Sequence, residues 1–360
     1  MRLTRRTLVG ALPALALTAC ARRDVAATLP PLRPLKNVAP FRVGTCLMTA
    51  ELADPQFVEL VRRNFSQVTP EWEMKMERIL GADGSLSFDA ADRIADFCRG
   101  SGMALHGTTL VWYEEDPPAF EALKDDRARF EAGLRDYIAA VVGRYRGLAR
   151  GWDVVNEAVA EDGDGYRGGV WAAGLGDDYA RLPFEMARAA DPDAVLFLND
   201  YNLELMPAKL DAFQRLAERL LAAGAPLTGL GTQSHLDVDT PSGRAGAAVR
   251  ALARFGLPIH VSELDISTRR PGLSLGGDAD PARLEAQARI AGEISEAFAD
   301  LPARQRYAFT VWGVRDKDSW LRGASSGDPH DAPLLFDAGG RPKPMLAAVE
   351  AAFERSDASR

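Results

Sequence analysis

Short runs rich in β-branched, aromatic and other apolar residues recur along the chain, each bounded by turn-forming or polar residues. Runs with this composition and these boundaries predict strands. Eight such runs follow one another, at 41–49, 65–70, 103–112, 151–157, 194–199, 229–235, 258–265 and 307–312.

Between these runs, apolar residues recur with helical spacing and are framed by helix start and stop signals. Asp54 followed by Pro55 predicts an N-cap and a first turn, and Asp89 begins a segment that ends before Gly102. The longest amphipathic segment, 120–148, predicts a single helix. Further helices are predicted at 178–190, 207–223, 242–255, 281–299 and 344–353.

Strict alternation of eight strands with eight helices is typical of α/β proteins with a parallel sheet. A doubly wound open sheet would carry a glycine-rich phosphate loop after an early strand, and the sequence has none there. We therefore predict the α/β class with a single (β/α)8 TIM barrel. Active sites of such barrels lie at the C-terminal ends of the strands.

The first twenty residues differ from the rest of the chain. Arg5-Arg6 precedes an apolar run, 8–17, which is too short to span a bilayer, and Leu-Thr-Ala-Cys follows, ending at Cys20. The arginine pair resembles a twin-arginine signal and the last four residues resemble a lipoprotein box with Cys20 as the lipidation site. An ordinary cleaved signal is the alternative. We expect export, to the periplasm or to a membrane as an anchored lipoprotein.

These signals predict three parts: a signal peptide at 1–20, a proline-rich tether at 21–36 and one catalytic barrel at 37–355. The formal net charge of −8 and the pI near 5.2 argue against a nucleic-acid partner, because such proteins usually carry a basic face. We expect a monomer.

Cys46 and Cys98 are interpreted as buried small hydrophobic residues, with a disulfide as the disfavoured alternative.

Two glutamates stand at the ends of opposed predicted strands. The fourth run ends in Asn156-Glu157 and the seventh contains Glu263. Paired carboxylates that converge across the mouth of a barrel meet the requirement of a glycosidase, in which one is protonated and the other ionised. A lone strand-end glutamate would more simply be a solvated residue, but two in register weaken that interpretation. Because side chains alternate along a strand, Asn156 and Glu157 both reach the site only if the strand ends in a bulge or turn.

No metal site and no cofactor are expected. The sequence has no HExxH helix, and His260 and Glu263 have opposite parity along their strand. His106 and His260 are interpreted as core or supporting histidines and His330 as a loop residue. Asp200 and Asp265 are expected to support structure rather than catalysis.

The chain resembles glycoside hydrolase family 10, whose best-known members are endo-β-1,4-xylanases, over nearly all of the predicted barrel. Eight motifs, in family order, carry the resemblance. They are VTPEWEMK (68–75), TLVW (109–112), WDVVNEAV (152–159), ADPDAVLFLNDYN (190–202), GLGTQSHL (229–236), SELDI (262–266), VWGVRDKDSW (311–320) and PLLFDAGGRPKP (333–344).

The resemblance implies a role for each matching residue. It makes Glu157 the general acid/base, Glu263 the nucleophile and Asn156 the partner of the sugar 2-hydroxyl. It also implies that Gln233 and His235 hold the nucleophile side. The remaining residues implied to bind substrate are Glu71, Lys75 and Trp112 in the glycone subsites and Trp312 and Trp320 as aromatic walls.

Two positions depart from the family pattern. Trp72 stands where members usually have Asn after the first glutamate, and Thr108 stands where they have His. The resemblance therefore implies an intact mechanism, with these two positions affecting substrate and rate.

The leading hypothesis is an exported retaining endo-β-1,4-xylanase that hydrolyses xylan or xylo-oligosaccharides. A second hypothesis keeps the machinery but changes the substrate to another β-glycan or aryl glycosides. A third is a tethered glycan-binding protein with a degenerate site. Glu157 and Glu263, together with Asn156 and His235, favour an enzyme, since a binding module does not need them.

Overall fold

The computed structural model describes residues 32–163, 165–269, 280–323 and 327–358. The expected signal peptide with Cys20, and all but the end of the expected tether, lie outside the described residues. Among those that are described, no helix is both long enough and apolar enough to cross a bilayer.

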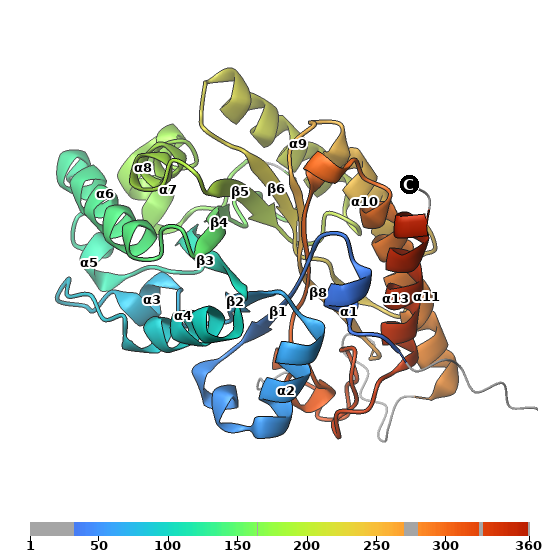
Figure 1. Ribbon diagram of the computed structural model, residues 1–360. Coiled ribbons are helices and arrows are strands. Elements are labelled where there is room, and N and C mark those ends of the chain that lie inside the picture. The colour runs from blue at the N-terminus through green and yellow to red at the C-terminus, as the bar shows by residue number, and fades with distance from the viewer. Residues whose placement is uncertain (1–31, 164, 270–279, 324–326, 359–360) are drawn as a thin grey trace, which may run out of the picture. The chain divides into compact units, whose positions relative to one another are not determined.

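Parallel strands form a closed barrel at the centre of the molecule (Figure 1). Its strands run in the order β6-β5-β4-β3-β2-β1-β9-β8, and β6 pairs with β8 to close the ring. The predicted (β/α)8 barrel is therefore confirmed. The bounds are β1 Arg42–Leu47, β2 Gln67–Pro70, β3 Ala104–Trp112, β4 Ala149–Asn156, β5 Val195–Asp200, β6 Gly229–Thr232, β8 Ile259–Ser267 and β9 Arg306–Val311.

The sixth predicted strand is interrupted near its end. The chain leaves the barrel after Thr232, and His235–Asp237 forms a short separate strand, β7, that pairs with β8. Ser234 lies between the two with φ 62°, in the left-handed region. A non-glycine residue in that region bends the chain sharply, so β7 does not simply continue β6.

Helices surround the barrel on the outside (Figure 1). Their apolar faces pack against the strands, as in α2, where Phe57 and Val61 are fully buried. The α-helices are α1 Leu35–Val38, α2 Pro55–Asn64, α3 Met76–Ile79, α4 Asp89–Ser101, α5 Pro118–Glu121, α6 Arg127–Arg144, α7 Gly169–Leu175, α8 Leu182–Ala190, α9 Pro207–Ala222, α10 Arg244–Ala253, α11 Pro281–Ala299, α12 Trp320–Gly323 and α13 Pro344–Ala358. Short 3-10 turns are η1 Thr49–Ala53, η2 Gly176–Asp178, η3 Ala303–Gln305 and η4 Asp316–Asp318.

Two predicted helices differ from the structure. The single helix expected at 120–148 is two helices, because Asp126 accepts a hydrogen bond from the Arg129 backbone N and so caps a new helix, α6. The helix expected at 178–190 is η2 followed by α8, which begins at Leu182 with Pro183 in its first turn.

The folded unit begins before the expected boundary at 37. Arg33 donates its backbone N–H to Glu350 Oε1 at 2.9 Å, and Leu35, the first residue of α1, is fully buried. The prolines at 30, 31 and 34 extended the expected tether to residue 36, but burial of Leu35 outweighs that local signal. At the other end, α13 continues to Ala358.

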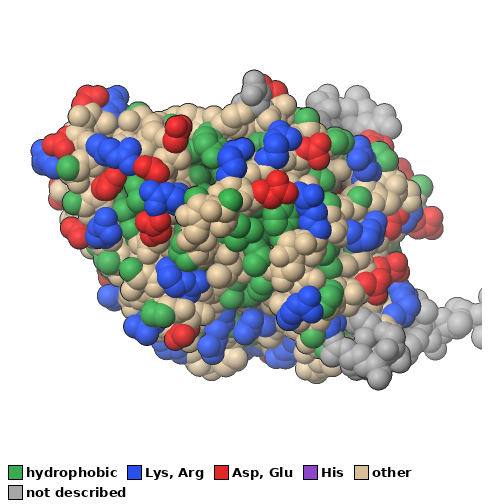
Figure 2. All heavy atoms as spheres, turned by 90° about the horizontal axis from the view of Figure 1, so that it is seen from above, with side chains coloured by type: hydrophobic (Ala, Val, Ile, Leu, Met, Phe, Trp, Pro, Cys, Tyr) green, Lys and Arg blue, Asp and Glu red, His purple; other side chains and the backbone are tan. Residues whose placement is uncertain are grey.

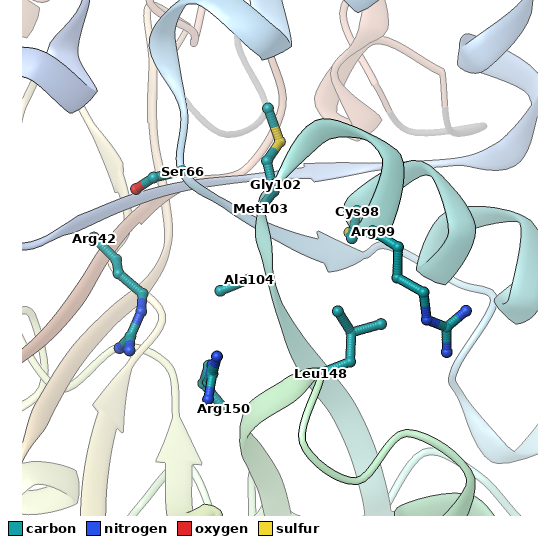
Figure 3. Close-up of a pocket in the computed structure, with 9 residues that line it drawn as sticks. All are labelled: Arg42, Ser66, Cys98, Arg99, Gly102, Met103, Ala104, Leu148 and Arg150. Carbon is teal, nitrogen blue, oxygen red and sulfur yellow. The ribbon is translucent and has the colours of Figure 1, made fainter.

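A pocket of about 430 Å³ lies at the opposite end of the barrel from the predicted site (Figure 3). Part of its wall comes from the beginnings of strands, with Arg42 opening β1, Ala104 opening β3 and Arg150 near the start of β4. The last turn of α4 supplies another part. The pocket belongs to the N-terminal mouth, which in this fold serves stability rather than catalysis.

The outer surface carries both signs of charge. On the face that Figure 2 shows, basic and acidic side chains are interspersed, with hydrophobic side chains between them. Such a surface is well solvated. Cys46 and Cys98 are both buried free thiols, as interpreted from the sequence.

Candidate active site

Glu157 directly follows the last residue of β4. The register of β4 against its neighbour β5 shifts between Asp153 and Val155, and Glu157 has φ 56°. This irregularity confirms the sequence-based condition that the strand must end in a bulge or turn. It places Asn156 and Glu157 on the same side, where Asn156 Nδ2 donates to Glu157 Oε1 at 3.2 Å.

Glu263 lies in β8, across the barrel from β4. The pairing of β8 with β9 shifts between Val261 and Leu264, and the Glu263 backbone N–H donates to Gln233 O at 3.1 Å. Glu263 and Glu157 are each only 7% exposed. Both carboxylates are therefore largely withdrawn from bulk water. Electrostatic interactions with a substrate are stronger in such a buried site than in water.

Asn199, in β5, links the two sides of the site. Its Nδ2 donates to Asn156 Oδ1 at 2.9 Å and to Glu263 Oε1 at 3.1 Å, while Ser262 Oγ donates to its Oδ1 at 2.8 Å. Sequence reasoning assigned Asn199 no role, although it lies at a strand end within one of the eight motifs. One buried amide thus orients both the Asn156 amide and the Glu263 carboxylate.

Gln233 contacts the opposite carboxylate from the one expected. Its Nε2 donates to Glu157 Oε1 at 2.8 Å and lies 3.4 Å from Asn156 Oδ1. The expectation that Gln233 holds the nucleophile side together with His235 is wrong for the Gln233 side chain. The left-handed bend at Ser234 separates the two residues, so Gln233 faces Glu157.

His235 stands on the nucleophile side as expected. Its Nε2 lies 3.5 Å from Glu263 Oε2 and its Nδ1 lies 3.0 Å from Asp265 Oδ2. Burial alone would lower the pKa of His235, but the carboxylates of Asp265 and Glu263 raise it well above its usual value. Asp265 also accepts the indole N–H of Trp320 at 2.8 Å, in keeping with a supporting role.

Burial sets the protonation of Glu157. Loss of water around the carboxyl raises the pKa of Glu157 to about 7, against the hydrogen bond from Gln233, which lowers it. A carboxyl with such a pKa holds its proton in mildly acidic solution and can donate it to a leaving oxygen.

The two glutamates face a cavity of about 330 Å³. A cavity of this size lies within the range of ligand sites. The residues that line it are Glu71, Trp72, Lys75, Trp112, Tyr113, Glu114, Glu157, Tyr201, Gln233, His235, Glu263, Trp312 and Trp320. Every expected substrate residue except Asn156 lines the cavity, and Asn156 lies just behind Glu157.

One side of the cavity combines a cation with aromatic rings. Lys75 Nζ lies 3.9 Å from the centre of the Trp72 ring and 4.5 Å from that of Trp112. Burial raises the pKa of the neighbouring Glu71 to about 7, with Lys75 opposing that shift. These groups can stack on a pyranose and donate hydrogen bonds to its hydroxyls.

Comparison with known proteins agrees with this geometry. The model of glycosyl hydrolase family 10 matches residues 35–352. The chain belongs to this family.

Two similar relatives are named endo-1,4-beta-xylanases. One, endo-1,4-beta-xylanase 2 of Claviceps purpurea, is 33% identical over 309 residues, covering 86% of each chain. Another, endo-1,4-beta-xylanase A of a Caldicellulosiruptor strain, is 36% identical over 318 residues, covering 84% of this chain. The match spans only 45% of that longer relative.

The solved structures include a thermostable mutant of a xylanase from Cellvibrio japonicus. It superposes with a TM-score of 0.82 at 31% identity, over 89% of this chain and 99% of that one. The family 10 barrel is thus shared along nearly its full length.

The two departures from the family 10 pattern lie in different surroundings. Trp72 lines the cavity and contacts Lys75. Thr108 is 2% exposed and is not one of the described residues that line it. Of the two, Trp72 is therefore the one placed to touch a sugar.

Proposed function

We propose that this family 10 chain is a retaining endo-β-1,4-xylanase that hydrolyses xylan or xylo-oligosaccharides by double displacement. The observation that carries the proposal is the hydrogen-bonded link from Glu157 through Asn156 and Asn199 to Glu263, with both carboxylates facing one cavity. The xylanase names of the relatives supply the substrate class.

In the first step, Glu263 attacks the anomeric carbon while Glu157 gives its proton to the departing glycosidic oxygen. The C–O bond to the aglycone breaks and an ester bond to Glu263 forms. In the second step, Glu157, now ionised, takes a proton from water, and the resulting hydroxide oxygen displaces Glu263. Two inversions leave the β-configuration unchanged.

The neighbouring groups act by orientation. Asn199 and His235 hold the Glu263 carboxylate from two sides, at 3.1 and 3.5 Å. Asn156 is positioned next to Glu157 to bond the sugar 2-hydroxyl, an interaction that strengthens in the transition state. Trp312 and Trp320 line the cavity and offer faces for stacking.

A second candidate substrate is another β-glycan. Trp72 favours it, because a large ring replaces the small amide typical of the family at a position that lines the cavity. The machinery around Glu157 and Glu263 would be the same.

An assay of the purified protein on xylan, xylo-oligosaccharides of defined length and cellulose tests the proposal. Mixed oligosaccharides released early from xylan, with no release from cellulose, are expected of an endo-xylanase. Release from cellulose alone would replace xylan by a glucan, and inactivity on all β-glycans and on aryl xylosides would favour the binding-protein hypothesis.

We also propose export with membrane attachment through a lipidated Cys20, and action as a monomer. The Arg5-Arg6 pair and the four-residue box support export and attachment. Replacing Arg5-Arg6 by Lys-Lys should leave the protein in the cytoplasm, and Cys20→Ser should release it from membranes. Unchanged membrane association of Cys20→Ser would refute the anchor.

A further inference from the structure

Three side chains with metal-ligating atoms lie together inside the barrel, away from the cavity. They are His106 of β3, Asp153 of β4 and His260 of β8, which are 0%, 1% and 0% exposed. One ligand atom of each lies within 4.8 Å of those of the other two. The cluster joins strands on opposite sides of the barrel.

Each residue also brings a buried polar atom without a hydrogen bond. No described residue forms a hydrogen bond with His106 Nε2, Asp153 Oδ1 or His260 Nδ1. His106 Nε2 and Asp153 Oδ1 are 3.1 Å apart, but they are not aligned as donor and acceptor. Buried polar atoms in folded proteins are normally paired, so three in one cluster call for a common partner.

The other nitrogen of each imidazole is held by a hydroxyl. His106 Nδ1 lies 3.0 Å from Tyr307 Oη, and His260 Nε2 lies 2.8 Å from Thr310 Oγ1. Each contact holds its ring in one orientation, and the hydroxyl oxygen can accept the N–H of that nitrogen. A ring whose N–H donates to its hydroxyl presents a lone pair at the unpaired nitrogen.

We infer that His106, Asp153 and His260 bind one divalent transition-metal ion of the zinc type inside the barrel. Two imidazoles and one carboxylate suit Zn²⁺, with water as a fourth ligand. Metal–ligand distances of about 2.0–2.1 Å in a tetrahedron separate two ligand atoms by about 3.3 Å. The 3.1 Å between His106 Nε2 and Asp153 Oδ1 is close to that value.

A simple ion pair between protonated His106 and Asp153 explains less. It would call for an aligned N–H···O contact, which the pair does not have, and it leaves His260 Nδ1 unsatisfied. The bound metal satisfies all three atoms at once. A bridging water is the remaining competitor, and the experiment below separates it from a metal.

The inferred role is structural and is separate from the proposed hydrolase activity. The metal would link β3, β4 and β8. Trp112 lies in β3, Glu263 lies in β8 and Glu157 directly follows β4. Because the ligands are fully buried, the ion enters during folding or slow opening of the barrel, and stripping it requires unfolding.

The experiment uses the purified protein, unfolded in denaturant with a chelator and refolded with or without Co²⁺ or Zn²⁺. We expect about one ion per chain after removal of excess metal, with the intense visible absorption of tetrahedral Co²⁺. Zn²⁺ at roughly a hundredfold over its Kd should raise Tm by about 3–5 °C.

Variants assign the ligands. Asp153→Asn and His260→Gln should each lose the absorption and the Tm rise, whereas His330→Gln should keep both. His330 is exposed, so this control removes one of the four histidines without touching the cluster. Uptake that is the same in all three variants would place the metal elsewhere and overturn the inference.

A wild-type measurement covers the case in which the cluster variants do not fold. X-ray absorption of the Zn²⁺-loaded protein should show two imidazole nitrogens and oxygen donors at about 2.0–2.1 Å. Refolded wild type that takes up no Co²⁺ or Zn²⁺ overturns the inference in favour of a bridging water. Neither result depends on xylan hydrolysis, so the proposed function is tested separately.

Discussion

At the residue scale, burial prepares Glu157 for its role as the acid. Loss of water raises the pKa of Glu157 to about 7, and the Gln233 amide opposes the shift. The acid must be protonated to act, so raising the pH through that pKa removes the working form. The sequence shows the glutamate but not this shift of its pKa, because the shift depends on what packs around the carboxyl.

The first prediction is a pH profile. Above pH about 7, kcat/KM on xylo-oligosaccharides should fall about tenfold per pH unit, because Glu157 of the substrate-free enzyme ionises. In Gln233→Ala the bond that favours the ionised form is lost, so the alkaline limb should move to higher pH. A limb that moves to lower pH, or activity still constant at pH about 9, would contradict Glu157 as the acid.

A second prediction separates the two roles. Glu263→Ala should lose turnover on every substrate, because no nucleophile remains, and azide should restore product with inverted configuration. Glu157→Ala should lose activity on xylo-oligosaccharides but retain much of it on aryl glycosides with good leaving groups, which scarcely need a proton. Equal losses of the two variants on both substrate types would show that the roles are misassigned.

A third prediction concerns Trp72. Trp72→Asn restores the amide typical of the family at the cavity and should raise kcat/KM on unsubstituted xylo-oligosaccharides by about two- to tenfold, the value of one neutral hydrogen bond. Trp72→Phe keeps an aromatic ring beside Lys75 and should give no such gain. If Trp72→Asn is slower than wild type, the indole itself binds the substrate.

At the scale of elements, regular patterns were predictable and local interruptions were not. All eight strand runs are in the barrel, since apolar composition and length determine them. The break at Ser234 and the cap at Asp126 depend on one residue each, and both were missed. The role of Asn199 has no sequence signal, because it arises only when the closed barrel brings β5 within reach of both β4 and β8.

The fourth prediction tests how β6 positions Asn199. A Cβ at Gly231 would lie 2.2 Å from Asn199 Oδ1, and a Cβ at Gly229 would lie 2.4 Å from the Phe197 ring. Gly231→Ala and Gly229→Ala should both destabilise the fold by about 1–3 kcal/mol through overpacking. Only Gly231→Ala displaces a residue bonded to Glu263, so only it should lower kcat, by about ten- to a hundredfold. Equal kcat values would exclude a positioning role for Asn199.

At the scale of the whole molecule, the predicted barrel is confirmed, and most of the residues expected in the site line one cavity. Glu157, Glu263, His235 and the aromatic walls lie where the strand-end argument and the family motifs put them. The buried cluster of His106, Asp153 and His260 carries no spacing signal, because its members come from three separate strands. Only the closed barrel brings them within reach of one another.

The central claim is that Glu157 and Glu263 cleave a β-glycosidic bond by two successive inversions. Family resemblance and paired strand-end carboxylates imply a separation of about 5–5.5 Å, which leaves no room for a water between nucleophile and sugar. The configuration of the first-formed product reports directly on that geometry.

Proton NMR of xylo-oligosaccharide hydrolysis, recorded before mutarotation, is the most direct test. The two-step mechanism predicts that the β-anomer signal of the new reducing end appears first and the α-anomer follows only by slow equilibration. Appearance of the α-anomer as the first product would contradict the retaining assignment and the nucleophilic role of Glu263.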